Sequence, residues 1–261
     1  MSAPVFVAAP DTLAAAAVGG RVTLDGAEAR HAVSVVRLRV GESLDLVDGR
    51  GRRVSGVVAD LPGRDTLVVS VMSVTDEPQS QPRVVVVQAL AKGDRGELAV
   101  EQLTEIGIDE IVPWSAAHCV VQWKGDRAQK SEQRWRDALT SAAKQSRRAR
   151  FPELAPLATT AQVADRLRAA ELAVVLHEDG REPVGALRLP PSGTCVIVVG
   201  PEGGIAPDEL TAFAAAGATV TRLGPTVLRT SSAGLAAAAA LLAGSDRWRM
   251  SQAASAPPVE G

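Results

Sequence analysis

The stretch that decides the fold is "TCVIVVGPEGGIAPDEL", residues 194–210. It begins with a run of apolar, mostly β-branched residues, which is typical of a strand covered on both faces. A glycine-bearing turn follows, and Pro207 with two acidic residues then opens a helix that Gly217 ends. A strand, a short turn and a helix in this order predict one repeat of an α/β domain.

The same alternation continues on both sides of this stretch. Apolar runs predict further strands at 84–90, 109–114, 172–179 and 219–224, and helices are expected at 94–107, 127–149 and 230–243. Strands that alternate with helices predict a mostly parallel sheet covered by helices. We therefore expect an α/β domain over residues 84–250.

The first 74 residues follow a different pattern. Short β-branched runs at 21–24, 42–49, 52–61 and 65–74 are separated by Gly, Asp or Pro turns, which predicts a small β-barrel at 1–74. Residues 75–83 are polar with two prolines and predict a linker. The terminal stretch 251–261 predicts a disordered tail.

Charge is unevenly distributed along the chain. The 261 residues carry a formal net charge of −2, which by itself argues against a nucleic-acid-binding protein. Residues 124–150, however, hold nine basic and three acidic residues. This basic segment predicts contact with RNA phosphates, and a solvated helix face is the alternative.

Other classes of protein are disfavoured. Cys119 and Cys195 lie far apart with no Cys or His beside them at metal-ligand spacing, so neither a disulfide framework nor a metal site is expected. Glu97, Glu101 and Glu105 recur every fourth residue and fit a solvated helix stripe better than a metal site. No signal-peptide pattern and no long apolar run is present, so we expect a cytoplasmic protein that does not enter a membrane.

Two turns are candidates for a ligand site. The turn "GPEGG" (200–204) matches neither the Walker loop nor the dinucleotide fingerprint, yet its glycines allow a ligand close to the backbone. The turn "LGPTVLRTSS" (223–232) also joins a strand to a helix. Ligands of open α/β sheets lie beyond the carboxyl ends of strands, so these turns and residues 176–177 should share one pocket. The alternative is a pair of tight turns and a capped, alanine-rich helix that bind nothing.

The chain resembles the bacterial 16S ribosomal RNA uridine-N3 methyltransferases (ribosomal small subunit methyltransferase E) of the SPOUT superfamily. The specific matches are "VVGPEGGIAPDEL" and "LGPTVLRTSSAG" with their spacing, and "LAKGDRGELAVEQLTEIGIDEIVPWSAAHCVV" adds to them. The match of "HAVSVVRLRVGESLDLVDGRG" is looser. The resemblance implies a PUA-like barrel followed by an α/β methyltransferase domain with a deep trefoil knot. It also implies a homodimer, S-adenosylmethionine as cofactor and 16S rRNA of the small ribosomal subunit as partner.

Site residues follow from the resemblance and from the two turns. Arg229 would stabilise the uracil anion because its guanidinium keeps its charge, and Glu202 would accept the proton or hold the methyl donor. The predicted cofactor-binding residues are Leu176, His177, Gly200, Pro201, Glu202, Gly203, Gly204, Leu223, Gly224, Val227, Leu228, Thr230, Ser232 and Ala233. The predicted RNA-binding residues are Arg37, Arg39, Lys92, Arg95, Lys144, Arg147 and Arg148. No metal is expected.

Three positions depart from the family pattern. Ser231 stands where the family has a glutamate, Gln102 stands where it has a lysine, and "MSAPVFV" lacks the usual arginine. Two other functions therefore stay open. One is methylation of another RNA target, such as a ribose 2′-hydroxyl, and the other is an RNA-binding ribosome-assembly protein without catalysis, which Ser231 would favour.

Overall fold

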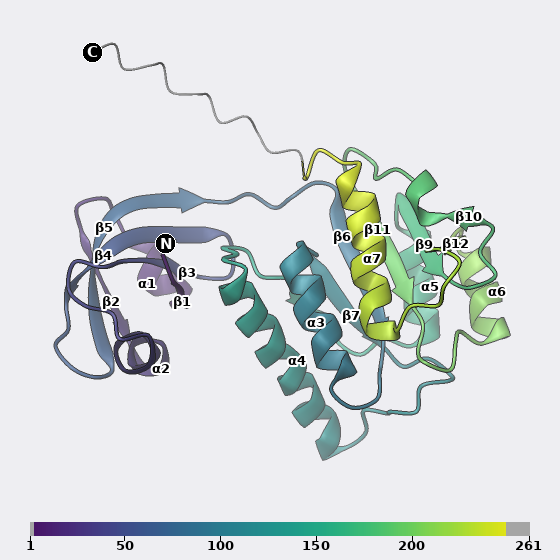
Figure 1. The fold of residues 1–261 in the computed structure, drawn as a ribbon, viewed down its shortest axis with the longest axis horizontal. Helices are drawn as coiled ribbons and strands as arrows, with labels where there is room; N and C mark the ends of the chain where they lie inside the picture. The colour runs from purple at the N-terminus through teal and green to yellow at the C-terminus, as the bar shows by residue number, and fades with distance from the viewer. Residues whose placement is uncertain (1–2, 249–261) are drawn as a thin grey trace, which may run out of the picture. The chain divides into compact units, whose positions relative to one another are not determined.

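The computed structural model describes residues 3–248, and the chain forms two compact units (Figure 1). The N-terminal unit comprises Met1–Gln79, Val100–Gly107 and Lys130–Glu153. The C-terminal unit comprises Ser80–Ala99, Ile108–Gln129 and Leu154–Gly261. The first unit is a curled sheet with added helices, and the second is the predicted α/β structure.

The sheet of the N-terminal unit has five strands in the order β1-β3-β4-β5-β2. The strand β1 pairs with β3 in parallel, and the other pairs are antiparallel. The elements before residue 80 are β1 (Val5–Val7), α1 (Pro10–Ala14), β2 (Arg21–Asp25), α2 (Gly26–Arg30), the π-helix η1 (His31–Val36), β3 (Ser43–Val47), β4 (Arg52–Asp60) and β5 (Thr66–Asp76).

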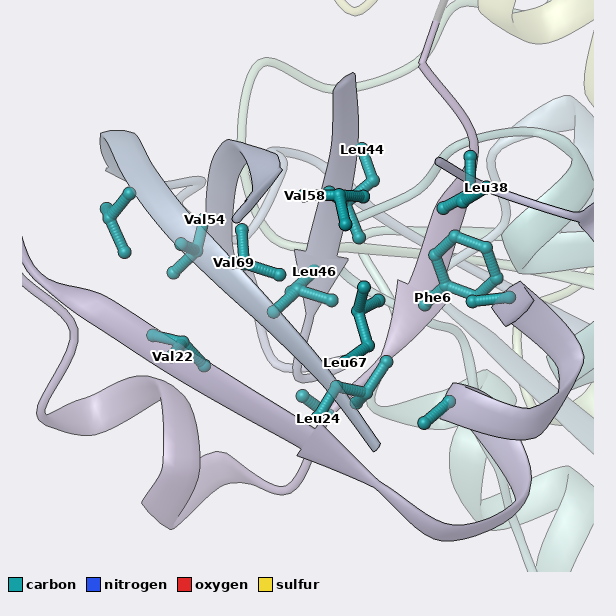
Figure 2. Packing of buried hydrophobic residues seen from close by; sticks show 14 of the residues in the cluster. Phe6, Val22, Leu24, Leu38, Leu44, Leu46, Val54, Val58, Leu67 and Val69 are labelled. Atoms are coloured by element: carbon teal, nitrogen blue, oxygen red, sulfur yellow. The ribbon is translucent and has the colours of Figure 1, made fainter. Parts of the chain in front are cut away.

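One face of this sheet forms the core of the N-terminal unit. Side chains from different strands meet there, as Figure 2 shows for Leu46, Leu67 and Val69, all of which are fully buried. In β2 only alternate residues, Val22 and Leu24, are buried, as the two-residue period of a strand requires. The strands predicted at 21–24, 42–49, 52–61 and 65–74 are confirmed. They could be predicted because this alternation is visible in the sequence.

Helices in the first 80 residues were not predicted. The helix α1 starts at Pro10 and buries Leu13, and α2 leads directly into η1. Each has only five or six residues, which is too short for the helical period to stand out from the surrounding pattern. Arg37 ends η1 with a left-handed backbone (φ 62°), which is uncommon for a residue other than glycine.

The end of the basic segment also belongs to the N-terminal unit. The helix α4 (Asp126–Gln145) places the Lys144 ammonium 2.7 Å from a carboxylate oxygen of Glu28. Just beyond it, Ala149 packs in a small cluster with Val5 and Val47. The helix ends four residues earlier than the predicted 149, because residues 146–149 leave the helix to make these contacts.

The sheet of the C-terminal unit has seven strands in the order β10-β12-β9-β11-β6-β7-β8, and its registered pairs are all parallel. Its strands are β6 (Arg83–Ala89), β7 (Glu110–Trp114), β8 (Glu153–Leu154), β9 (Leu172–Leu176), β10 (Glu182–Pro183), β11 (Thr194–Val199) and β12 (Thr219–Arg222). The remaining helices are α3 (Arg95–Ile106), α5 (Thr160–Arg168), the short 3-10 helix η2 (Val184–Ala186), α6 (Pro207–Ala215) and α7 (Thr230–Ala243).

This topology brings distant turns together. The strand β11 lies between β9 and β6, and β12 pairs with the far side of β9, so the carboxyl ends of β9, β11 and β12 share one edge. The helix α7 packs on β11 and β6 (Figure 1). The α/β fold after a PUA-like sheet is confirmed, while the trefoil knot stays a prediction.

The predicted boundaries of the parts stay predictions as well. The strands β5 and β6 reach into the predicted linker at 75–83, with ends at Asp76 and Arg83. The predicted tail at 251–261 lies outside the described residues. Among residues 3–248, none of the helices combines the length and apolarity that a membrane span needs.

Candidate functional site

A pocket of about 560 Å³ lies at the carboxyl ends of β9, β11 and β12. Its volume falls within the roughly 300–1,000 Å³ of small-molecule sites. Three turns and the start of two helices form its wall. The lining residues are Arg95, Leu176, His177, Glu178, Val199, Gly200, Pro201, Glu202, Gly203, Gly204, Ile205, Arg222, Leu223, Gly224, Pro225, Thr226, Val227, Leu228, Arg229, Thr230 and Ala233.

Residues 200–206 are here called the β11–α6 loop. Glycine is required at two of its positions, at one because a neighbouring side chain is close and at the other because the backbone is left-handed. A Cβ atom on Gly203 would lie 3.0 Å from the Cβ of His118. The backbone of Gly204 is left-handed (φ 75°), and its N–H donates to the Pro201 carbonyl at 2.9 Å. This turn is therefore compact, and its backbone borders the pocket without side chains in between.

The buried carboxylate of Glu209 holds the far side of this loop. Its Oε1 accepts hydrogen bonds from the Ala117 N–H and the Thr160 hydroxyl, both at 2.9 Å. Its Oε2 accepts from the Ala206 N–H at 3.1 Å. Glu209 is only 6% exposed, so these bonds replace water that the carboxylate has lost. One side chain thus joins the loop to two other segments of the C-terminal unit.

Glu202 is the acid of the loop that points to the pocket. Its Oε1 accepts a hydrogen bond from the Lys92 N–H at 3.1 Å and lies 3.6 Å from Nη1 of Arg95. Arg95 is the first residue of α3 and also lines the pocket. The candidate catalytic acid is therefore engaged with a candidate RNA-binding arginine.

Residues 223–229, here called the β12–α7 loop, form the opposite wall. Val227 is 82% exposed, and the backbone of α7 begins after Arg229, whose carbonyl accepts from the N–H groups of Ser232 and Ala233 at 2.9 Å. The guanidinium of Arg229 is exposed and makes no hydrogen bond or ion pair within residues 3–248. It is therefore free to contact a bound molecule.

One hydrogen bond joins the β11–α6 loop to Thr230, the first residue of α7 after the β12–α7 loop. The hydroxyl of Thr230 donates to the Gly200 carbonyl at 2.8 Å. Beneath it, the amide of Gln88 lies 3.5 Å from the Thr230 carbonyl. Gln88 is fully buried, and its Oε1 has no hydrogen-bond partner in the described part of the chain. Gln88 does not itself line the pocket, so it can act on a bound molecule only through Thr230.

The structure brings nearly all of the predicted cofactor-binding residues to this pocket. Ser232 is the exception, since it does not line the pocket. Six further residues line the pocket that were not predicted as cofactor-binding: Glu178, Val199, Ile205, Arg222, Pro225 and Thr226. Pro225 and Thr226 stand inside the predicted turn 223–232, and extending the three turns by one residue would have found the other four. Gln88, which lies behind Thr230 and does not line the pocket, had no such signal, because a glutamine inside an apolar strand carries no motif.

The predicted RNA-binding residues are divided between the two units. Arg37 and Arg39 are exposed on the N-terminal unit, while Lys92 and Arg95 belong to the C-terminal unit. Lys144 is paired with Glu28, as described above.

Two further arginines of that set take part in hydrogen bonds that involve the backbone of the N-terminal unit. The Arg148 guanidinium donates to the carbonyls of Thr104 and Arg150 at 2.8 and 2.9 Å, and the Arg147 carbonyl accepts from Arg53 at 2.8 Å. Arg147 itself has a left-handed backbone (φ 57°). The side chain of Arg148 therefore has a structural explanation, whereas Arg147 contributes its backbone carbonyl. The role of both residues toward RNA stays a prediction.

Two of the positions that depart from the family pattern are partly or fully buried. Ser231 is 3% exposed and is not among the lining residues of the pocket. Gln102 has a buried Oε1 that lacks a hydrogen-bond partner among residues 3–248.

Cysteine and metal chemistry add no second site. Both cysteines are buried thiols, and burial raises the pKa of Cys195 to about 12 and that of Cys119 above its ordinary value. Within residues 3–248, no group of three or more His, Cys, Asp or Glu side chains could hold a metal ion.

Comparisons with known proteins agree with this geometry. Residues 78–242 match a family described as "RNA methyltransferase domain", and residues 24–72 match "RNA methyltransferase PUA domain". The "Ribosomal RNA small subunit methyltransferase E" of Mycobacterium bovis is 45% identical over 92% of this chain and 90% of its own length. The protein of the same name from Bacillus subtilis is 28% identical over 84% of this chain and 88% of its own.

A solved structure has the same fold. The "Ribosomal RNA small subunit methyltransferase E from Neisseria gonorrhoeae bound to S-adenosyl methionine" matches with a TM-score of 0.80 and 28% identity. The match covers 92% of this chain and 96% of that one. The matched ranges include the pocket and both of its loops, so this chain belongs to the RNA methyltransferase family that contains the ribosomal RNA small subunit methyltransferases E.

Proposed function

We propose that this protein methylates N3 of a specific uridine in 16S rRNA of the small ribosomal subunit, with S-adenosylmethionine as methyl donor. The observation that carries the proposal is the pocket between the β11–α6 and β12–α7 loops, with an unpaired Arg229 at its wall. The names of the relatives, and the methyl donor in the Neisseria gonorrhoeae structure, support the same reaction.

The pocket fits the methyl donor chemically. Leu176, Leu223 and Leu228 supply apolar surface for an adenine ring, and the backbone of Gly200 and Gly204 offers polar groups without side-chain bulk. Thr230 and Ala233 at the start of α7 allow a ligand to lie against the helix. When bound, S-adenosylmethionine supplies an electrophilic methyl group on a sulfonium.

Arg229 would act on the acceptor base. Uracil N3 carries a proton that must leave, and the resulting negative charge spreads onto the two neighbouring carbonyl oxygens. A guanidinium keeps its charge at any physiological pH and can donate hydrogen bonds to such an oxygen. Arg229 would thus lower the energy of the uracil anion in which N3 is nucleophilic.

The partners and location follow from the same proposal. The N-terminal unit, with exposed Arg37 and Arg39, would bind the RNA, and Lys92 and Arg95 would do so near the pocket. We further propose a homodimer formed through the α/β domain with its trefoil knot, which acts in the cytoplasm.

The deciding experiment is a map of modified nucleosides in 16S rRNA from a strain that lacks this protein. We expect N3-methyluridine to disappear and to return when the wild-type gene is restored, but not with Arg229→Ala. Unchanged N3-methyluridine would overturn the proposal, and loss of a ribose-methylated nucleoside would instead favour the 2′-hydroxyl as target.

Binding of the methyl donor distinguishes the proposed enzyme from the third candidate function, that of a ribosome-assembly protein without catalysis. A ribosome-assembly protein without catalysis would give no heat of binding in calorimetry with S-adenosylmethionine, although the protein is folded. We expect binding with one donor per chain.

A further inference from the structure

We propose that Glu202 is a positioning residue rather than the proton acceptor, and that it holds Arg95 at the mouth of the pocket to bind the RNA phosphate beside the target nucleotide. This inference rests on the proposed function and specifies how its substrate is held. It starts from the contacts of Glu202, which connect the β11–α6 loop to residues 92–95 of the C-terminal unit.

The first step concerns the orientation of the carboxylate. Oε1 of Glu202 accepts from the Lys92 N–H at 3.1 Å and faces Nη1 of Arg95 at 3.6 Å. The side chain is 28% exposed, so it is partly withdrawn from water. These two contacts turn the carboxylate toward the start of α3.

The second step concerns the place of Arg95 in the helix. Arg95 is the first residue of α3, and a cation there opposes the partial positive charge of a helix N-terminus. The helix does not gain stability from this arginine, whereas Glu202 and a bound anion would both compensate its charge. The position of Arg95 at the start of α3 is therefore explained by its binding of Glu202 and of an anion, and not by helix stability.

The third step concerns the remaining hydrogen-bonding capacity of Arg95. A guanidinium has five N–H donors, and Glu202 is the sole ion-pair partner of Arg95 within residues 3–248. The side chain is 41% exposed and lines the pocket. Its planar fork matches the geometry of phosphate oxygens.

The fourth step explains why an acid would be useful beside an RNA-binding residue. A free arginine side chain loses much rotamer freedom when it binds, and this loss weakens the complex. Holding the guanidinium through Glu202 before RNA arrives removes part of that cost. The acid thus improves RNA binding although its own charge repels phosphate.

The test uses Glu202→Gln, Arg95→Ala and the double variant, with small ribosomal subunits from the deletion strain as substrate. We expect Arg95→Ala to raise KM for the subunit by about tenfold, as for the loss of one charged hydrogen bond. Glu202→Gln should raise KM by a few fold and lower kcat by less than threefold. Glu202→Gln should have almost no further effect once Arg95 is absent, because Glu202 acts through Arg95.

A second readout is the salt dependence of binding to the unmodified subunit. Loss of one phosphate contact should lower the slope of log affinity against log salt by about 0.7 to 0.9. We expect this change for Arg95→Ala, and restoration of the slope by Arg95→Lys. The matched control is Arg168→Ala. Like Arg95, Arg168 is an arginine paired with one carboxylate, that of Asp165 on α5, but it does not line the pocket. This substitution should leave the slope unchanged.

Two results would overturn the inference. One is a loss of kcat of a hundredfold or more in Glu202→Gln that persists in the Arg95→Ala background, which would make Glu202 the proton acceptor. The other is an unchanged salt slope in Arg95→Ala. Failure of the proposed function looks different: the wild-type protein would then form no N3-methyluridine, while the salt slope could still be measured by binding alone.

Discussion

The two loops that line the pocket have opposite surroundings. Contacts from Lys92, His118, Glu209 and Thr230 hold the β11–α6 loop in place, that of His118 being between its Nδ1 and the Gly203 carbonyl oxygen at 3.1 Å. Residues 223–228 of the β12–α7 loop make no hydrogen bond to another segment within the described part of the chain, and Val227 is 82% exposed. The β11–α6 loop is thus a preformed wall of the pocket and the β12–α7 loop is an open one. We propose that the preformed wall receives the methyl donor and that the open wall adjusts to the RNA.

The largest effect is expected from a substitution of Arg229 in the open β12–α7 loop. Arg229→Ala should lower kcat by roughly 10²- to 10³-fold, the effect of removing one group that stabilises an anionic transition state. Affinity for S-adenosylmethionine should change by less than about threefold, since a surface change outside the methyl-donor contacts has little effect. Single-turnover methylation and calorimetry measure the two quantities.

A control for charge is Arg222→Ala, which removes another exposed arginine from the pocket wall. It should retain most of the turnover. If Arg229→Ala were fully active, the open loop would have no chemical role, and the two loops would differ in shape alone.

The next effect is expected from Glu209 behind the preformed loop. Glu209→Ala leaves the Ala117 and Ala206 N–H groups and the Thr160 hydroxyl without their acceptor. The free energy of unfolding should fall by about 2–3 kcal/mol, because buried donors lose their partner. Urea denaturation followed by circular dichroism measures this, and Glu209→Gln should recover part of the loss because its carbonyl still accepts. A fall below 0.5 kcal/mol would mean that the loop does not depend on this acid.

One glycine from each loop provides a matched pair. A Cβ atom on Gly203 would lie 3.0 Å from the Cβ and 3.2 Å from the carbonyl oxygen of His118, whereas a Cβ atom on Gly224 would meet nothing within 4 Å. Gly203→Ala should therefore lower the free energy of unfolding by about 1–2 kcal/mol. Gly224→Ala should change it by less than about 0.5 kcal/mol. Equal values in thermal unfolding without ligand would contradict the difference between the loops.

A smaller effect is expected from the bond that joins the loops. Thr230→Val removes the hydroxyl that donates to the Gly200 carbonyl and keeps the shape of the side chain. The expected loss is about 1 kcal/mol, the typical net value of one hydrogen bond. Differential scanning calorimetry should show a melting temperature lower by roughly 2–4 °C, and Thr230→Ser should retain most of the stability. A melting temperature equal to that of the wild type would show that the loops hold their positions independently.

The smallest effect is expected at the tip of the open loop. Val227→Ser should change the free energy of unfolding by less than about 0.5 kcal/mol, because the side chain is 82% exposed and buries little apolar surface. Urea denaturation measures it. A loss above 1 kcal/mol would mean that Val227 is covered in solution, as in contact with a second copy of the chain.

Much of the pocket could be predicted because its signals are local. The glycines of "GPEGG", Pro207 and the apolar strand before them stand within one short stretch. Arg229 could be proposed for the same reason, since it follows a strand at a turn. The parallel order of strands then required both turns to meet at one edge.

The contacts between distant segments could not be predicted. The pairing of Glu202 with Arg95 joins residues more than one hundred positions apart, and the bonds of Glu209 to Ala117 and Thr160 span 92 and 49 positions. In the sequence, Glu209 is one of two acids in the first turn of a helix, a position that the helix dipole already explains. The short helices before residue 37 were missed because a single turn has no period to read.

The sequence by itself determined the alternation of strands and helices, the two glycine-bearing turns and the family, because these depend on residues within a few positions of one another. The tertiary structure decided which side chains are free and which are engaged. Lys144 and Arg148 appeared as surface cations in a basic segment, but folding places them against Glu28 and the Thr104 carbonyl. Arg229 makes no ion pair among the described residues, because the topology carries the end of β12 to an open wall of the pocket.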